Sequence, residues 1–473
     1  MRSFLGVTVH ITSGSEITTF EIGARQMDQR TTTANLVVAM REMCRDDWKI
    51  NYNKVRAVVT DGGANIKAAA KQEFGAGKHL SYLSHRFDLI GQKAIGNIST
   101  LPSERTSPEP EVPDDEDDID DEVEVEAGST NFRTILNKVK RKVTFFKKSE
   151  IASLKLRELQ KDEHGKLDSK CLNLIQKVKT RWNSCFDMLD RYIYLAPLVT
   201  RVVLELQRTR ASKERAPELI SPMEEYILKE IRDLLAPLAR ATKEVSTDKI
   251  VTLSKSIPVI NNLRREIDDY LLTEPEACAL KENLTTLLRD AFASIEEVPM
   301  YAAATLLDPR FKKFRFWQDI SSRRSDLVKK KMAKGSTQPL SDKVPEAQST
   351  VAEQSDSFWD SFDKEVEGRS AAQSGQDMAG GIPIQFRMYL DSAPVKRKDF
   401  PNPLRAWAAI KGEYKYVYQV AQENLSILAT SVPSERLFSN AGLIKNQLRT
   451  RLSGKLLEIL VFLRSCDNAL WFE

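Results

Sequence analysis

The sequence contains no long hydrophobic run. Its longest apolar stretch, residues 456–463, is interrupted by Glu458 and falls far short of the roughly 20 residues that cross a bilayer. The first residues, MRSFLGVTVHITSG, have the β-branched alternation that is typical of a strand and not of a signal peptide. We therefore expect an intracellular protein without a membrane segment.

Cysteine and histidine are scarce, and neither forms a site motif. The five cysteines include no C-x-x-C pair, which argues against a disulfide framework and a structural zinc site. The four histidines accompany no G-x-S-x-G sequence, so a serine nucleophile of that type is not indicated. In QEFGAGKH, Gln72 and His79 occupy positions where a phosphate-binding loop needs Gly and Ser or Thr.

Charge is abundant but unevenly distributed. The chain of 473 residues has 29% charged residues and a net charge of +4. Residues 101–127 carry 13 acidic side chains against the single Arg105, which leaves the rest of the chain near +16. A basic body with an acidic insert is weak support for a polyanionic partner.

Residues 1–100 have the pattern of a small α/β unit. Two β-rich runs, 4–12 and 16–25, flank SGS and predict a hairpin. A helical pattern and the short apolar run VRAVVTDGG follow, and such a run is typical of a buried strand. We predict the order strand, strand, helix, strand, helix, strand, helix.

The remaining chain divides by composition. Residues 101–130 are too acidic to form a core and predict a disordered loop. We assign 131–332 to a helical domain in which Ser221 caps a helix that begins at Pro222, 333–383 to a flexible linker, and 384–473 to C-terminal helices. Residues 133–150 carry seven basic side chains. They form either a nuclear-import or DNA-backbone patch, or a solvated helix face that the acidic loop partly neutralises.

Two carboxylates, Asp61 and Glu435, occupy positions where a functional site is possible, although each also has a simple structural explanation. Asp61 ends a predicted strand and precedes two glycines, which suits either a turn or a ligand site. Glu435 follows Pro433 at a predicted helix start, where Ser431 or Ser434 can cap and the helix dipole favours an acid. The residues alone leave the role of Glu435 open.

Two amphipathic helices are predicted at the C-terminus. They can complete the core or present a dimer surface. Ser453 is a candidate cap for the second helix. The candidate dimerisation residues are Leu437, Ile444, Leu448, Leu456, Leu460 and Leu463.

Five blocks of the sequence resemble the hAT superfamily of DNA transposases and their BED zinc-finger-type relatives, and they follow one another along the chain in the family's order. The most specific is LSILATSVPSERLFSNAGLIKNQLRTRLSGKLLEILVFLRS, which resembles the family's C-terminal dimerisation region. The others are FLGVTVHIT, VRAVVTDGGANI, TRWNSCFDMLDR and AATLLDPRFK. The resemblance extends over nearly the whole chain.

The resemblance implies an RNase H-like fold interrupted by a large helical insertion. It also implies a site where three carboxylates hold divalent metal ions for cleavage and transfer of DNA strands. Asp61 would be the second acid and Glu435 the third, and both would be metal ligands. Candidate DNA contacts are Trp182, Arg436, Lys445, Arg449, Arg451 and Lys455, although a lone Trp182 is otherwise a core residue.

Several family features are missing from the sequence. The first family aspartate lies on the strand that precedes the one matching FLGVTVHIT, and that strand is missing from this sequence. The family's upstream BED finger is missing as well. We expect the loss of that central strand to expose strand edges. The family's C-x-x-H pair is reduced to Tyr82 and His85, and its paired tryptophans to Ala406 and Trp407. Two acids hold Mg²⁺ or Mn²⁺ poorly, so we expect no transposition and no cofactor, with Mg or Mn required only if the protein is active.

Three hypotheses follow. The first is a catalytically inactive, transposase-derived nuclear protein that forms dimers or higher homo-oligomers through its C-terminal region and binds DNA. The second is a truncated form of an active, metal-dependent hAT transposase. The third is a helical dimerisation scaffold that does not bind DNA.

Overall fold

A computed structural model describes most of the chain, and all structural statements below concern its described residues. These are residues 3–98, 132–164, 167–178, 182–208, 216–247, 250–312, 384–430, 432–444 and 453–465. The predicted acidic loop at 101–130 and the predicted linker at 333–383 lie outside them.

The chain forms two compact units. The mixed unit comprises Met1–Phe87, Arg240–Arg265 and Ala291–Glu473, and the helical unit comprises Asp88–Ala239 and Glu266–Asp290. Helices α3 (Leu83–Ile98), α7 (Pro222–Val245), α8 (Ser256–Asp269) and α9 (Pro275–Phe292) contribute residues to both units. The remaining helices of the helical unit are α4 (Phe132–Lys148), α5 (Glu150–His164) and α6 (Trp182–Arg208).

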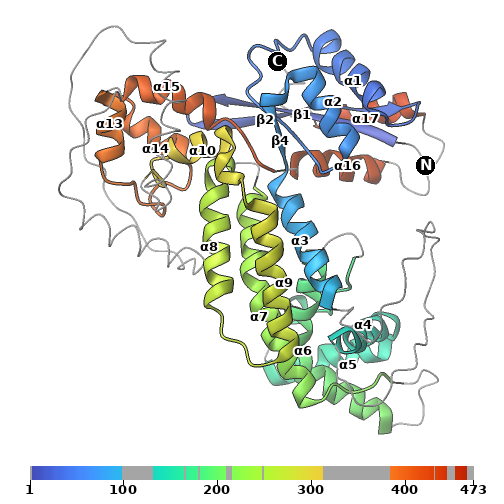
Figure 1. Ribbon diagram of the computed structural model, residues 1–473. Coiled ribbons are helices and arrows are strands. Elements are labelled where there is room, and N and C mark those ends of the chain that lie inside the picture. Colours follow the sequence, from blue (N-terminus) through green and yellow to red (C-terminus); the bar gives the residue numbers. More distant parts are fainter. Residues whose placement is uncertain are drawn as a thin grey trace, which may run out of the picture. The chain divides into compact units, whose positions relative to one another are not determined.

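The mixed unit joins the two ends of the sequence (Figure 1). Its first elements are β1 (Ser3–Ser13), β2 (Glu16–Met27), α1 (Thr33–Arg41), β3 (Val58–Thr60), α2 (Ala64–Phe74) and β4 (His79–Ser81). This order, followed by α3, confirms the predicted one. Its later helices are α10 (Pro299–Leu306), α13 (Ile384–Asp391), α14 (Pro403–Ile410), α15 (Lys415–Asn424), α16 (Val432–Ile444) and α17 (Gly454–Ser465).

The strands of the described residues form two small sheets. β1 and β2 are antiparallel, as the hairpin pattern predicts, and Gly14 adopts a φ of 60° in their turn. β3 and β4 are parallel. The chain is therefore mostly helical with small sheets, which confirms a helix-rich mixed class.

Helices cover both faces of the β1–β2 hairpin (Figure 1). On one face, Leu5 of β1 packs in a core cluster with residues of α1 and α2. On the other face, Ala24 of β2 packs with Leu437 of α16 and with Leu457 and Val461 of α17. Side chains alternate between the faces of a strand, so neighbouring strand residues reach both clusters. The hairpin is thus the middle layer of the mixed unit.

Several local predictions hold in the described part of the chain. The backbone N–H of Leu456 donates to the Ser453 hydroxyl at 3.3 Å, so Ser453 caps α17. Ser221 and Glu224 form a reciprocal capping box at the start of α7, with distances of 2.8 and 3.2 Å. Of the two candidate caps for α16, Ser434 lies in the first turn of the helix, which begins at Val432, and Ser431 lies outside the described residues.

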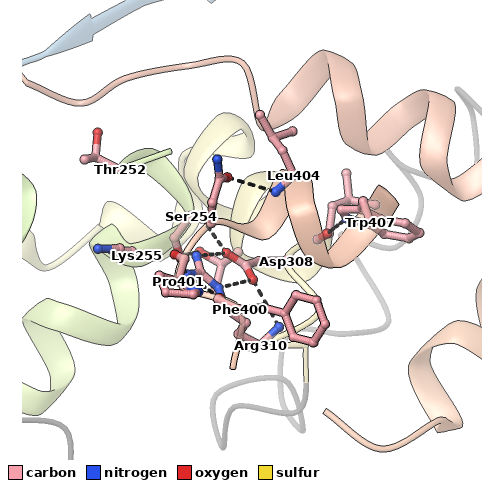
Figure 2. A network of polar contacts seen from close by, with 12 residues as sticks. Thr252, Ser254, Lys255, Asp308, Arg310, Phe400, Pro401, Leu404 and Trp407 are labelled. Carbon is pink, nitrogen blue, oxygen red and sulfur yellow. Dashed lines mark hydrogen bonds and ion pairs between the residues drawn. The ribbon is translucent and has the colours of Figure 1, made fainter. Parts of the chain in front are cut away.

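A buried ion pair organises the segment after α10 (Figure 2). Asp308 and Arg310 are 0% and 2% exposed, and their carboxylate and guanidinium lie 2.7 Å apart. The Ser254 hydroxyl donates to Asp308 at 2.6 Å, and Arg310 donates to the carbonyl oxygen of Pro401. The DPRF sequence therefore joins three segments of the mixed unit, which sequence reasoning did not foresee.

We predict that Asp308→Ala destabilises the mixed unit by about 3–5 kcal/mol, because it leaves the Arg310 guanidinium buried without its carboxylate. Denaturant unfolding measures this change. Arg56→Ala is the control, since Arg56 and Glu423 form an exposed pair whose loss costs at most about 1 kcal/mol. Equal effects of the two substitutions would contradict the role of the buried pair.

The helical unit is closely packed where α3 meets α6. The Trp182 ring lies so near Gly91 that a Cβ on that glycine would be 2.5 Å from two ring atoms. Around Gly96, on the same helix, nothing lies within 4 Å of such a Cβ. These two glycines provide a matched test of the packing.

Gly91→Ala should destabilise the helical unit by about 1–3 kcal/mol through overpacking. Gly96→Ala should stabilise it by about 0.5–1 kcal/mol, because alanine favours a helix interior. The unfolding free energy of each variant, followed by circular dichroism, checks both signs. A neutral Gly91→Ala would show that Trp182 is not packed against α3.

Candidate functional site

Asp61 and Tyr82 lie side by side at the ends of two parallel strands. The pairing of β3 with β4 places Thr60 opposite Ser81, and Asp61 and Tyr82 come next in each segment. The backbone N–H of Tyr82 donates to the Thr60 carbonyl oxygen at 2.9 Å, which extends the pairing beyond the strands. Polar side chains at the same edge of a parallel sheet form a natural ligand site.

The two glycines after Asp61 allow close approach at this edge. Asp61 Oδ1 accepts a hydrogen bond from the Gly63 N–H at 3.0 Å, which is a local turn contact. A Cβ on Gly62 would lie 3.1 Å from Nε2 of His85, so the His85 ring approaches the Gly62 backbone. The remaining histidine of the C-x-x-H block therefore lies beside the segment that follows Asp61, a position that sequence reasoning did not assign.

The C-terminal segment reaches the same strand ends. The Leu83 N–H donates to the Ala429 carbonyl oxygen at 3.1 Å, and the Ala429 N–H donates to the Thr252 hydroxyl at 2.7 Å. These contacts hold the chain just before α16. In the first turn of α16, the Ser434 hydroxyl lies 3.4 Å from the Tyr82 hydroxyl, although 352 positions separate the two residues.

Electrostatics at Tyr82 show that both predicted carboxylates lie near it. Burial is the largest cause that raises the pKa of the Tyr82 phenol, and the negative charges of Asp61 and Glu435 raise it further. The hydrogen bond with Ser434 opposes this rise. The fold thus brings Asp61 and Glu435 to a common neighbour, Tyr82, from opposite ends of the chain.

This donor set does not complete a metal site within the described residues. No group of three or more His, Cys, Asp and Glu side chains there is arranged to hold a metal ion. Mg²⁺ in phosphate-transfer sites is commonly held by one or two carboxylates together with waters and substrate phosphates, so a metal ion at Asp61 and Glu435 would need such further ligands.

The candidate DNA contacts are placed differently from one another. The Trp182 indole is 1% exposed and packs inside the helical unit, so in this structure it is a core residue. Arg436 is exposed on α16. Burial raises the pKa of Glu21, and the positive charge of Arg436 opposes this rise. Lys455 is exposed. Lys445, Arg449 and Arg451 lie outside the described residues.

The candidate dimerisation residues differ in their exposure to solvent. Leu437 is buried within the mixed unit, so it is not a surface residue, and Ile444 is partly buried against the same cluster. Leu456 and Leu463 are 45% and 38% exposed, Leu460 is half-buried, and Leu448 lies outside the described residues. Sequence reasoning missed Ile459, which is 53% exposed on the same helix as Leu456, although the spacing of three from 456 indicated it.

The titration of Tyr82 tests whether the two acids meet. Asp61→Asn and Glu435→Gln should each lower the pKa of the Tyr82 phenol toward its usual range, because each removes a negative charge that raises it. Carbon-13 NMR of ring-labelled tyrosine, with Tyr82→Phe to assign the resonance, measures this shift. If only one substitution moves the pKa, the other acid does not face Tyr82.

Comparisons with known proteins identify the C-terminal region and two relatives of the chain. Residues 385–466 match the hAT family C-terminal dimerisation region. The chain is 24% identical over 332 residues to zinc finger BED domain-containing protein 4 from Homo sapiens, an alignment that covers 69% of this chain and 26% of that protein. It is 23% identical over 341 residues to the putative AC transposase from Zea mays, which covers 66% of this chain and 40% of that protein.

The chain thus spans about a quarter and two-fifths of the lengths of these two relatives. The described helices include none that is long and apolar enough to cross a membrane. The resemblance of the sequence to hAT proteins is confirmed: residues 385–466 carry the hAT family C-terminal dimerisation region, and the chain is similar to a zinc finger BED domain protein and to a transposase.

Proposed function

We propose that this chain is a nuclear, transposase-derived protein that forms dimers through its C-terminal region and binds DNA. The observation that carries the proposal is the match of residues 385–466 to the hAT family C-terminal dimerisation region. In addition, the Ser434 hydroxyl in the first turn of α16 lies 3.4 Å from the Tyr82 hydroxyl. This contact supports a shared site for Asp61 and Glu435, the two acids that the family resemblance selects. The relatives include a transposase and a zinc finger BED domain protein, which supports DNA as the partner.

We also propose that the mixed unit is an RNase H-like core with a helical insertion. The unit assembles its strands from the first 87 residues and its covering helices from both ends of the chain. The described strands form separate pairs, β1 with β2 and β3 with β4. Val58 of β3 packs against the cluster that contains Leu5 of β1, so both pairs contact the same helical layer. This arrangement supports a single core whose strand edges are exposed.

The chain on its own is proposed not to cleave DNA. Metal-dependent cleavage needs ions that activate the attacking group and stabilise the leaving oxygen. Asp61 and Glu435 are the two acids of the proposed site, and the described residues supply no group of three ligands. The proposed role is therefore binding rather than catalysis.

The second candidate function is that of an active hAT transposase of which this chain is a part. One specific observation favours it: the chain covers 26% and 40% of its two relatives, so a longer protein can supply a further carboxylate and a zinc finger. The third candidate, a dimerisation scaffold without DNA binding, rests on the matched C-terminal region alone.

The outer face of α17 is the proposed dimer surface. Leu457 and Val461 point into the core, the Phe462 ring lies 5.6 Å from that of Trp48, and Glu458 lies 3.8 Å from Arg25. The apolar side chains on the remaining face of the helix are Leu456, Ile459, Leu460 and Leu463, and the exposed Lys455 and Arg464 lie at the two ends of the helix. The spacing of three and four residues between the apolar side chains makes a continuous stripe, and a second copy of the chain can cover it.

We predict that Leu456→Glu combined with Ile459→Glu converts the dimer into a folded monomer, because both charges would be buried in the interface. Light scattering gives the mass, and circular dichroism checks the fold. Ile151→Glu is the matched control, since Ile151 is 63% exposed on α5 and should leave the dimer intact. A monomeric wild-type chain would contradict the proposal.

DNA binding and cleavage separate the candidate functions. The purified chain should bind duplex DNA with an affinity that falls as salt rises, and it should not nick DNA in Mg²⁺ or Mn²⁺. Asp61→Ala and Glu435→Ala should retain binding. Nicking that both substitutions abolish would establish the active transposase instead. Absence of salt-dependent binding would favour the scaffold.

A further inference from the structure

Helix α4 in the helical unit carries a regular stripe of positive charge. Arg133, Lys140 and Lys147 are seven residues apart in sequence, which places them on one face of the helix. At 1.5 Å per residue the stripe is about 21 Å long. Arg133 and Lys147 are exposed and Lys140 is half-buried.

Other basic residues of α4 serve the packing of the unit. Lys138 Nζ lies 2.9 Å from a carboxylate oxygen of Glu224 and 3.0 Å from one of Glu218. Burial lowers the pKa of Lys142 to about 8, and its amine donates to the Glu218 carbonyl oxygen. The cations on this side of the helix are therefore partnered by the segment that leads into α7.

Another cation, Lys177, lies beside the stripe. The extended segment 171–178 runs beside α4, because Lys147 donates to the Gln176 side-chain oxygen at 2.5 Å. The next residue, Lys177, is a neighbour of Lys140: burial lowers the pKa of Lys140, and the charges of Lys177 and Arg133 lower it further. The side-chain acceptors that the structure gives Lys140 and Lys147 among the described residues are neutral amides, those of Asn137 and Gln176.

Other contacts hold this arrangement in place. The Ser184 hydroxyl accepts from the Val178 N–H at 2.8 Å and donates to the Val178 carbonyl oxygen at 3.0 Å. The segment that carries Lys177 is thus fixed to α6 at one end and to α4 through Gln176. Positive charges held together in this way repel one another, and an anion placed between them removes that cost.

We propose that Arg133, Lys140, Lys147 and Lys177 form a binding surface for the phosphates of a nucleic-acid backbone. This rests on the proposed DNA binding and adds a contact surface in the helical unit to the C-terminal basic residues. A stripe of about 21 Å matches roughly six nucleotide steps at 3.4 Å along one strand. Lysine and arginine contacts to phosphate release counterions, so binding depends on charge and salt rather than on base sequence.

The test uses the full chain and a fluorescent DNA duplex, with affinity measured by anisotropy over a series of salt concentrations. Lys140→Gln and Lys177→Gln should each weaken binding, by up to about tenfold at low salt, and reduce the salt slope by about 0.9. Lys140→Arg should restore the wild-type slope. The thermal unfolding temperature of Lys140→Gln should be no lower than that of the wild type, since the substitution relieves like-charge repulsion.

Lys229→Gln is the matched control. Lys229 also belongs to the helical unit, and its removal changes the net charge equally, but its amine is paired with Glu225 at 2.8 Å. This variant should bind DNA as wild type does. A polyglutamate chain serves as a second probe, and it should compete only weakly with the duplex.

Two results would overturn the inference while the proposed function stands. One is wild-type affinity and slope in both Lys140→Gln and Lys177→Gln. The other is a loss of polyglutamate binding in Lys140→Gln and Lys177→Gln that no loss of DNA binding accompanies. That result would assign the surface to an acidic protein segment. If the wild-type chain binds no duplex DNA, both the inference and the proposed DNA binding fail.

Discussion

The backbone of Ala429 is the contact on which the rest of the candidate site depends. Its carbonyl oxygen accepts from the Leu83 N–H, next to Tyr82 at the end of β4, and its N–H donates to the Thr252 hydroxyl. Both groups are buried, and a buried backbone group without a partner costs about 1–3 kcal/mol. One residue thus fixes three segments from distant parts of the sequence, and α16 begins three residues later at Val432.

The position of α16 determines which groups the side chains of its first turn face. Glu435 has a local reason to occupy that turn, because the helix dipole favours an acid there, but a dipole does not determine what the acid faces. The tether at Ala429 and the contact of Ser434 with Tyr82 supply that orientation. The buried Asp308–Arg310 pair supports the same region, since Ser254, which bonds to Asp308, follows Thr252 by two residues. Local helix signals and long-range hydrogen bonds therefore act together.

Much of the fold could be predicted because its signals are local. The β-branched runs around SGS, the Asp-Gly-Gly after β3 and the caps at Ser221 and Ser453 each involve residues within a few positions of one another. Only the family resemblance assigned Asp61 and Glu435 to one site, since nothing local in the sequence connects them. What could not be predicted depends on tertiary contacts.

Three features show this limit in physical terms. Arg310 looks like a surface residue in sequence, yet it is buried because Asp308 and the Pro401 carbonyl oxygen satisfy its guanidinium. In α17 the periodicity allows several apolar faces, and only packing against Ala24 selects Leu457 and Val461 as the inner one. A lone Trp182 is typical of a core position, whereas the family resemblance made it a candidate DNA contact; its packing against Gly91 makes it a core residue in this structure.

The central claim is that the two ends of the chain bring Asp61 and Glu435 together. Nitroxide labels at positions 61 and 435 test it directly, since both side chains are exposed, and continuous-wave electron paramagnetic resonance detects dipolar broadening between close labels. The doubly labelled chain should give a spectrum much broader than the sum of the two single-label spectra. A doubly labelled spectrum equal to that sum would contradict the account.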